Sequence, residues 1–107
     1  DRGIDALNTE FEIESATYDG TDQLTLELDN TGSTTLSVAG VSVLLDGVIP
    51  AAGDVTTEVD GDGNTGLWLP GQTLTVDIDN VDEEPNRVKA VAENGIAETT
   101  NNVEVEA

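Results

Sequence analysis

The side chains in this sequence that could carry chemistry are carboxylates and hydroxyls. Its 107 residues include 23 Asp and Glu but no His, Cys or Met. A histidine general base, a thiolate nucleophile, a disulfide framework and a Cys/His zinc site are therefore excluded. Neighbouring carboxylates such as Glu83 and Glu84 recur along the whole chain, so their pairing does not indicate a general acid/base site. We expect no enzyme, no catalytic residue and no cofactor.

One loop has the beginning of a calcium-binding pattern. Asp60, Asp62 and Asn64 have the D-x-D-x-N spacing that opens a calcium loop. The sixth position is Thr65, where such a loop needs Gly, and the twelfth is Gly71, where it needs a bidentate Glu. We favour a polar turn with no metal, and a weak loop-type cation site is the alternative.

The excess of acidic residues excludes whole classes of partner. Only 3 residues are Lys or Arg, and the formal net charge is −20. Nucleic-acid recognition requires clustered basic residues, and an anionic membrane surface would repel this chain. The acids recur in nearly every block of ten residues rather than in one tail. In dilute buffer such a surface repels itself, but about 1 M salt shortens the electrostatic screening length to about 3 Å and largely removes this repulsion. The distribution of acids therefore predicts a protein from a halophile.

Two features could contact a protein partner. Trp68 is the one Trp of the chain, and it is either a core aromatic or an interface anchor. Residues 48–52 form an apolar segment in an otherwise acidic sequence. This segment is either an edge strand presented to a partner or a strand that crosses between sheets. We predict Val48, Ile49 and Trp68 as partner-binding residues.

Two of the three basic residues lie close together in the sequence. Arg87 and Lys89 are two residues apart, which places them on one face of a strand. We favour cross-strand pairing with neighbouring carboxylates over contact with an acidic partner.

Apolar and polar residues alternate along the chain, as in strands that bury one face. The alternation covers residues 11–13, 24–28, 41–45 and 74–78, and shorter apolar runs follow at 87–92, 96–99 and 103–105. Hairpin signals separate these runs at Asp19-Gly20, Asp46-Gly47 and Asn94-Gly95. No window has a helical pattern of useful length. The sequence therefore predicts an all-β fold, an immunoglobulin-like antiparallel β-sandwich of about seven strands.

The chain is long enough for one domain. Residues 1–8 lack a strand pattern and are predicted to be a linker, and residues 9–107 to form the β-sandwich domain. No apolar run approaches the roughly 18 residues of a membrane span. The chain begins with Asp1 rather than Met, so either an upstream segment has been removed or the sequence is a fragment.

Three stretches of the sequence resemble a known family. They are LELDNTGSTTLSVAGVSVLLDG (26–47), VDGDGNTGLWLPGQTLTVDI (59–78) and PNRVKAVAENGIAE (85–98). They are similar to the haloarchaeal FlaF family of accessory proteins of the archaellum, the archaeal flagellum. The likeness covers roughly residues 11–98, and the sister family FlaG, which shares the general plan, stays as an alternative.

The resemblance implies a non-enzymatic stator component that anchors the archaellum motor to the S-layer. It implies an N-terminal membrane helix, which this sequence lacks, and an outward-facing immunoglobulin-like domain. The implied location is the extracellular side of the archaeal cytoplasmic membrane, the pseudoperiplasm. The implied partners are the S-layer protein, a FlaG-type paralogue and the archaellum motor, in a homo- or hetero-oligomer. The family has no catalytic motif to transfer.

Two other functions fit the same composition. A pilin- or filament-type structural subunit also has a membrane helix followed by a β domain, and an upstream signal-peptidase site would favour it. A Ca²⁺- or carbohydrate-binding cell-surface module is the other alternative, and calorimetric titration with Ca²⁺ in molar KCl would test its calcium form.

Folding is expected to depend on salt, because 23 carboxylates repel one another around a small core. The melting temperature, followed by circular dichroism, should rise markedly between dilute buffer and about 3 M KCl as screening weakens that repulsion. An equal melting temperature in the two solutions would contradict the halophile interpretation.

Overall fold

Strands make up most of the regular structure. The computed structural model describes residues 8–106. The strands are β1 (Phe11–Tyr18), β2 (Leu24–Asn30), β3 (Leu36–Ser37), β4 (Ser42–Leu45), β5 (Val55–Val59), β6 (Leu67–Trp68), β7 (Thr73–Ile78), β8 (Val88–Val91), β9 (Ala97–Thr100) and β10 (Glu104–Val105). Two 3₁₀ helices, η1 (Val38–Gly40) and η2 (Ala52–Asp54), interrupt them. Within residues 8–106, no helix has the length and apolar composition that crossing a membrane requires.

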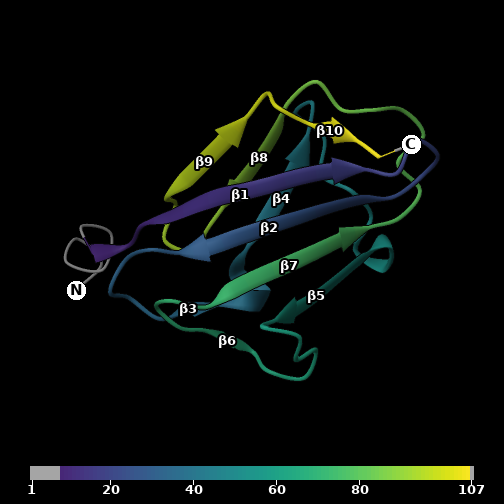
Figure 1. Ribbon diagram of the computed structural model, residues 1–107. Helices are drawn as coiled ribbons and strands as arrows, with labels where there is room; N and C mark the ends of the chain where they lie inside the picture. The colour runs from purple at the N-terminus through teal and green to yellow at the C-terminus, as the bar shows by residue number, and fades with distance from the viewer. Residues whose placement is uncertain (1–7, 107) are drawn as a thin grey trace.

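The strand order is that of an immunoglobulin constant-type sandwich. One sheet has the order β10-β1-β2-β7-β5, the other has the order β4-β8-β9, and a short ladder joins β3 to β6. Apart from β10, these orders correspond to the A-B-E-D and C-F-G sheets of that fold. The larger sheet lies in front of the smaller one in Figure 1. The predicted fold class, an all-β immunoglobulin-like sandwich, is confirmed.

Two details of the prediction need correction. The described residues form ten strands rather than about seven. The strands that the sequence did not predict are β3 and β6, which have only two residues each, and β5, which lies between the predicted runs. In addition, β10 runs parallel to β1, with Thr17 opposite Glu104, so the sandwich is not wholly antiparallel. Residues 1–7 of the predicted linker lie outside the described residues, and the boundary between linker and domain stays a prediction.

The core is built on the alternation of β2 and β7. Their inner faces form three cross-strand pairs of buried aliphatic side chains, Leu24 with Ile78, Leu26 with Val76 and Leu28 with Leu74. The smaller sheet contributes Val43, Val88 and Ala90, which are also buried. Burial of each large aliphatic side chain contributes roughly 1.5–3 kcal/mol, so these two strands supply a large share of the driving force for folding.

Trp68 belongs to the core and not to the surface. Its side chain is 0% exposed, and its ring packs edge-on against Phe11 with the ring centroids 5.6 Å apart. The indole N–H donates to the carbonyl oxygen of Gln72 at 2.8 Å, so its polar atom is satisfied. Since a fully buried side chain cannot contact a partner, the prediction of Trp68 as a partner-binding residue is corrected here.

A tight turn follows each of the strands β4 and β5 and brings the chain back to pair with the end of that strand. Asp46 and Gly47 have φ of 50° and 84°, and Asp60 and Gly61 have φ of 48° and 87°. Positive φ at both central residues is what a two-residue type I′ turn requires. The Asp46-Gly47 hairpin signal is thus confirmed, whereas Asp60-Gly61 was expected only as part of a loop. Asp19-Gly20 and Asn94-Gly95 lie in longer loops, where only the glycine has positive φ.

The loop after β2 holds the start of β1. The backbone N–H groups of Thr31 and Gly32 both donate to the carbonyl oxygen of Glu10, at 3.0 and 2.9 Å. The N–H of Ser33 donates to the carbonyl oxygen of Asn8 at 3.0 Å. A Cβ atom on Gly32 would lie 2.5 Å from that Asn8 oxygen and 2.6 Å from the Glu10 nitrogen, so no other residue fits without movement of the backbone.

The substitution Gly32→Ala should therefore lower the free energy of unfolding by roughly 1–3 kcal/mol, through overpacking and loss of these hydrogen bonds. Urea unfolding in molar KCl measures the change. Gly53→Ala is the control, because a Cβ on Gly53 meets nothing within 4 Å. Equal stability of the two variants would contradict the close approach at Gly32.

Candidate partner-binding site

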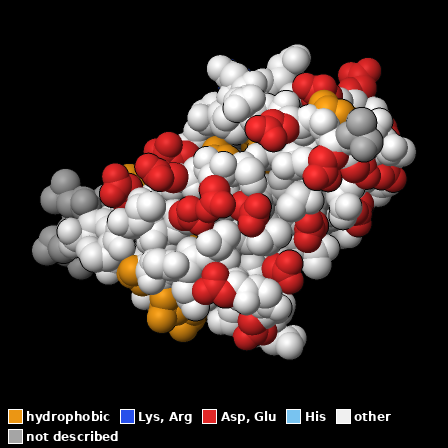
Figure 2. All heavy atoms as spheres, viewed as in Figure 1, with side chains coloured by type: hydrophobic (Ala, Val, Ile, Leu, Met, Phe, Trp, Pro, Cys, Tyr) orange, Lys and Arg blue, Asp and Glu red, His pale blue; other side chains and the backbone are white. Residues whose placement is uncertain are grey.

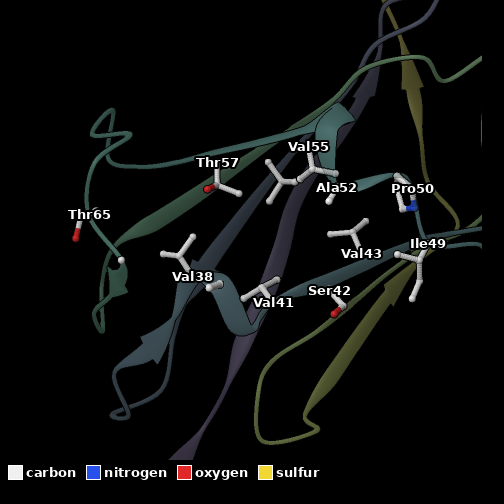
Figure 3. Close-up of a pocket in the computed structure, with 13 residues that line it drawn as sticks. Val38, Val41, Ser42, Val43, Ile49, Pro50, Ala52, Val55, Thr57 and Thr65 are labelled. Carbon is white, nitrogen blue, oxygen red and sulfur yellow. The ribbon is translucent and has the colours of Figure 1, made fainter.

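An uncharged groove opens between the two sheets on one side of the sandwich. Its volume is about 490 Å³. It is lined by Val38, Ala39, Val41, Ser42, Val43, Ile49, Pro50, Ala52, Val55, Thr57, Thr65, Gly66 and Val76. None of these residues carries a charge, although the chain has a net charge of −20. In Figure 3, Val38, Val41 and Val43 point from one side of the groove toward Val55 and Thr57 on the other.

The groove lies there because β4 and β5 are both edge strands. β4 ends the order of the smaller sheet, and β5 ends the order of the larger sheet. The segment at 48–52 connects them, so it crosses from one sheet to the other as an irregular connection and not as a strand. Val48 pairs with Leu45 for a single bridge, and Pro50, which has no N–H, cannot extend the ladder.

This connection exposes the two remaining predicted partner-binding residues. Val48 is 67% exposed and Ile49 is 66% exposed, and Ile49 also lines the groove. The structure therefore brings Ile49 together with valines of β4, η1 and β5 that sequence reasoning did not single out. Leu67 and Leu69, on either side of Trp68, are also exposed, as the alternation around Trp68 implies.

The Asp60–Asn64 loop has the hydrogen bonds of a turn. The Asp60 carboxylate accepts the backbone N–H of Thr73 at 2.9 Å, and the Asp62 carboxylate accepts the backbone N–H of Asn64 at 2.9 Å. Among residues 8–106, no group of three or more acidic side chains is arranged to hold a metal ion. The Asp60 and Asp62 carboxylates therefore hold this turn and the start of β7 through backbone N–H groups.

Arg87 and Lys89 are not paired with carboxylates, so that expectation is wrong. In the strand ladders, Lys89 lies opposite Leu44 on one side and Thr99 on the other. Within the described part of the chain, neither Arg87 nor Lys89 makes an ion pair.

Lys89 lies on the outer face of the smaller sheet, the face turned away from the core. The strand positions on this outer face are Ser42, Leu44, Lys89, Val91, Ala97 and Thr99. The outer face of the smaller sheet thus carries no acid at its strand positions.

The outer face of the larger sheet carries many of the acids, and several of them accept hydrogen bonds from hydroxyl side chains. Ser15 donates to Glu27 at 3.1 Å, Thr25 donates to Asp77 at 3.0 Å, and Thr73 donates to Asp29 at 2.8 Å. These are cross-strand neighbours, so a hydroxyl lies next to each of these three carboxylates, whereas Glu12 lies directly opposite Asp29. Figure 2 shows carboxylates spread over this face, with no Lys or Arg in view.

Glu14 departs from this spacing. The register of β1 against β2 shifts between Ile13 and Ser15, and this bulge leaves Glu14 without a cross-strand partner. A hydrogen bond and charge repulsion from Asp29 raise the pKa of the Glu14 carboxyl above its ordinary value of 4.5. Glu14 is exposed and lines a small hollow of about 110 Å³ beside β1, but Asp29 is not among the residues of that hollow, so the two carboxyl groups do not share an enclosed general acid/base site.

Structural comparison relates this sandwich to proteins of the archaellum. No family model and no curated protein matches the sequence. Among solved structures, the archaellum periplasmic stator protein FlaG from Sulfolobus acidocaldarius has a TM-score of 0.62 at 18% identity, over 86% of this chain and 97% of that one. A chain of the archaellum periplasmic stator protein complex FlaF and FlaG from the same organism has a TM-score of 0.62 at 19% identity, over 86% and 87%. The chain is thus an immunoglobulin-like sandwich of the FlaF/FlaG type in its fold.

Replacing Glu14 tests the carboxylate pair. Because its pKa is higher in the folded than in the unfolded chain, the folded chain binds more protons just above pH 4.5, and stability falls as the pH rises through that window. Glu14→Gln should therefore modestly raise the melting temperature at pH 7 in low salt, and the gain should vanish below pH 4.5.

Glu58→Gln removes one charge from the same sheet and is the control, because Glu58 lies opposite a threonine, Thr75. If the two variants gain equally, the effect is one of net charge, and the specific repulsion between Glu14 and Asp29 is refuted.

Proposed function

We propose that this chain is a non-enzymatic stator component of an archaellum, of the FlaF/FlaG type. The observation that carries the proposal is the likeness in fold to archaellum stator proteins, over most of this chain and of both neighbours. The sequence stretches at 26–47, 59–78 and 85–98 support the same family by a separate route.

The proposed role is mechanical and not catalytic. The groove between β4 and β5 is lined by apolar and hydroxyl side chains with no titratable group. Glu14 is exposed and Asp29 is half-buried, and the two do not share an enclosed site. Neither place combines a nucleophile, a base and a water-excluding pocket, which hydrolytic and transfer reactions require.

The proposed location is the extracellular side of the archaeal cytoplasmic membrane, with a membrane helix at the N-terminus of the full-length protein. Both structural neighbours are described as periplasmic. The carboxylates on the outer face of the larger sheet suit a halophile whose envelope is bathed in brine, because salt screens their mutual repulsion.

The proposed partners are the S-layer protein, a FlaG-type paralogue and the archaellum motor. The neighbouring complex of FlaF and FlaG supports a paralogue as partner in a hetero-oligomer. An S-layer protein of a halophile is itself acidic, so attraction between opposite charges cannot hold the two together. Apolar contact is the alternative, and Val48 and Ile49 are the exposed apolar side chains at the groove.

The proposal predicts that this domain retains purified S-layer protein of its own organism in a pull-down. Retention should hold or strengthen as KCl increases, unlike a charge-driven contact, which salt weakens. Ile49→Asp would bury an unpaired charge, which typically costs several kcal/mol and corresponds to an affinity about 100-fold lower or more.

Val105→Asp is the matched control, because Val105 is 50% exposed and lies on β10, outside the residues that line the groove. No retention by the wild type at any KCl concentration contradicts the stator proposal. Wild-type retention by a folded Ile49→Asp variant contradicts only the choice of surface.

A further inference from the structure

The wall of the groove formed by β4 carries an unpaired stretch of backbone. The N–H of Leu45 donates to the carbonyl oxygen of Val48 at 2.8 Å, and the N–H of Val48 donates back at 3.0 Å. The peptide groups of Leu45 therefore point away from β8. Since peptide direction alternates along an antiparallel strand, those of Val43 also point to the free edge. No other described residue accepts from or donates to them.

The wall formed by β5 has the same construction. Val59 exchanges two backbone hydrogen bonds with Asp62, both at 2.9 Å, so its peptide groups point away from β7. Two residues earlier, those of Thr57 also point to the free edge. They too lack a hydrogen-bond partner among the described residues. Each edge strand thus has its end paired by a tight turn and its middle without a backbone partner, although on β5 the loop at Gly63 lies near the Thr57 carbonyl oxygen, 3.7 Å from where a Cβ on that glycine would be.

We propose that this groove binds an extended, uncharged segment of a partner protein as an added β-strand. The segment would pair its backbone with Val43 or Thr57 and place alternate side chains between Val38, Val41 and Val55. The inference depends on the proposed function only for the identity of the partner, the S-layer protein. The residues Val48 and Asp62, which follow the two tight turns, already pair with one end of each edge strand. The added segment can therefore pair with only about three or four residues, which span roughly 3.3 Å each along the strand.

The chemistry of the walls selects this occupant over others. A strand supplies N–H and C=O groups at the spacing that Val43 and Thr57 require. A lipid chain or a small apolar molecule would cover these peptide groups without pairing them, which is unfavourable. A charged segment would lose its hydration against a wall that has no charge to pair with it.

Amide hydrogen exchange of the wild-type protein in molar KCl tests the pairing directly. The first probe is an end-blocked seven-residue peptide of alternating threonine and valine, and the second is purified S-layer protein. Exchange at the Val43 or Thr57 N–H should slow by at least about tenfold when either probe binds. The same peptide methylated on alternate backbone nitrogens keeps its side chains but loses donors, and it should not slow exchange.

Two neighbouring substitutions locate the contact. Thr57→Glu places a carboxylate in the groove, whereas Thr56→Glu places it on the exposed opposite face of the same strand. The first variant should bind the peptide at least about tenfold more weakly, and the second should bind like the wild type. Melting curves of both variants show whether each is folded, and the exchange measurement on the wild type does not depend on them.

The outcomes separate this inference from the proposed function. Slower exchange with the peptide but no binding of S-layer protein supports strand addition and contradicts the stator role. Binding of S-layer protein without slower exchange at either amide overturns strand addition and leaves the stator role intact. Strand addition is also overturned if neither probe slows exchange, or if the methylated peptide slows it equally. Slowing that depends only on protein concentration overturns it too, because it assigns the groove to a second copy of this chain.

Discussion

Repulsion among carboxylates is the constraint on which the rest of this structure depends. A domain of 107 residues with a net charge of −20 has few places where an acid can lie far from the next one. On the larger sheet, serine and threonine lie between the acids and donate to them, as Thr25 does to Asp77 and Thr73 does to Asp29. Where a bulge breaks this order, at Glu14, the pKa of the carboxyl rises.

Because carboxylates repel one another over most of this molecule, the surfaces without acids indicate where a partner protein can approach. The inner faces of the sheets are mainly apolar because they form the core. Two further surfaces have no carboxylate: the strand positions on the outer face of the smaller sheet and the walls of the groove. A partner that approaches either surface meets less repulsion than anywhere on the larger sheet. In brine, where screening leaves apolar burial as the main attraction, such surfaces favour protein contact.

The topology explains why the groove is at one particular side. In a constant-type sandwich, the strands at the positions of β4 and β5 end their sheets on the same side, and the groove opens between them. After the tight turns at Asp46-Gly47 and Asp60-Gly61, the chain pairs with each edge strand through a single bridge. Pro50, which has no N–H, prevents the pairing along β4 from continuing. An exposed edge is usually a liability for aggregation, and here a short length and an acidic surround limit it.

Local patterns in the sequence determined the class of fold. The alternation at 24–28 and 74–78 predicted the two central strands, because period two is a property of the strand itself. The turn at Asp46-Gly47 also follows from local residue types. The apolar run at 48–52 fitted either an edge strand or a strand that crosses between sheets, and the tertiary structure decided that Val48 and Ile49 are exposed. Long-range contacts decided what local patterns cannot express. Trp68 is buried because Phe11 packs on it. The β1–β10 pair is parallel because the chain returns from the other sheet. Val38, Val41 and Val55 form a groove because two edge strands that are distant in the sequence meet on one side of the sandwich.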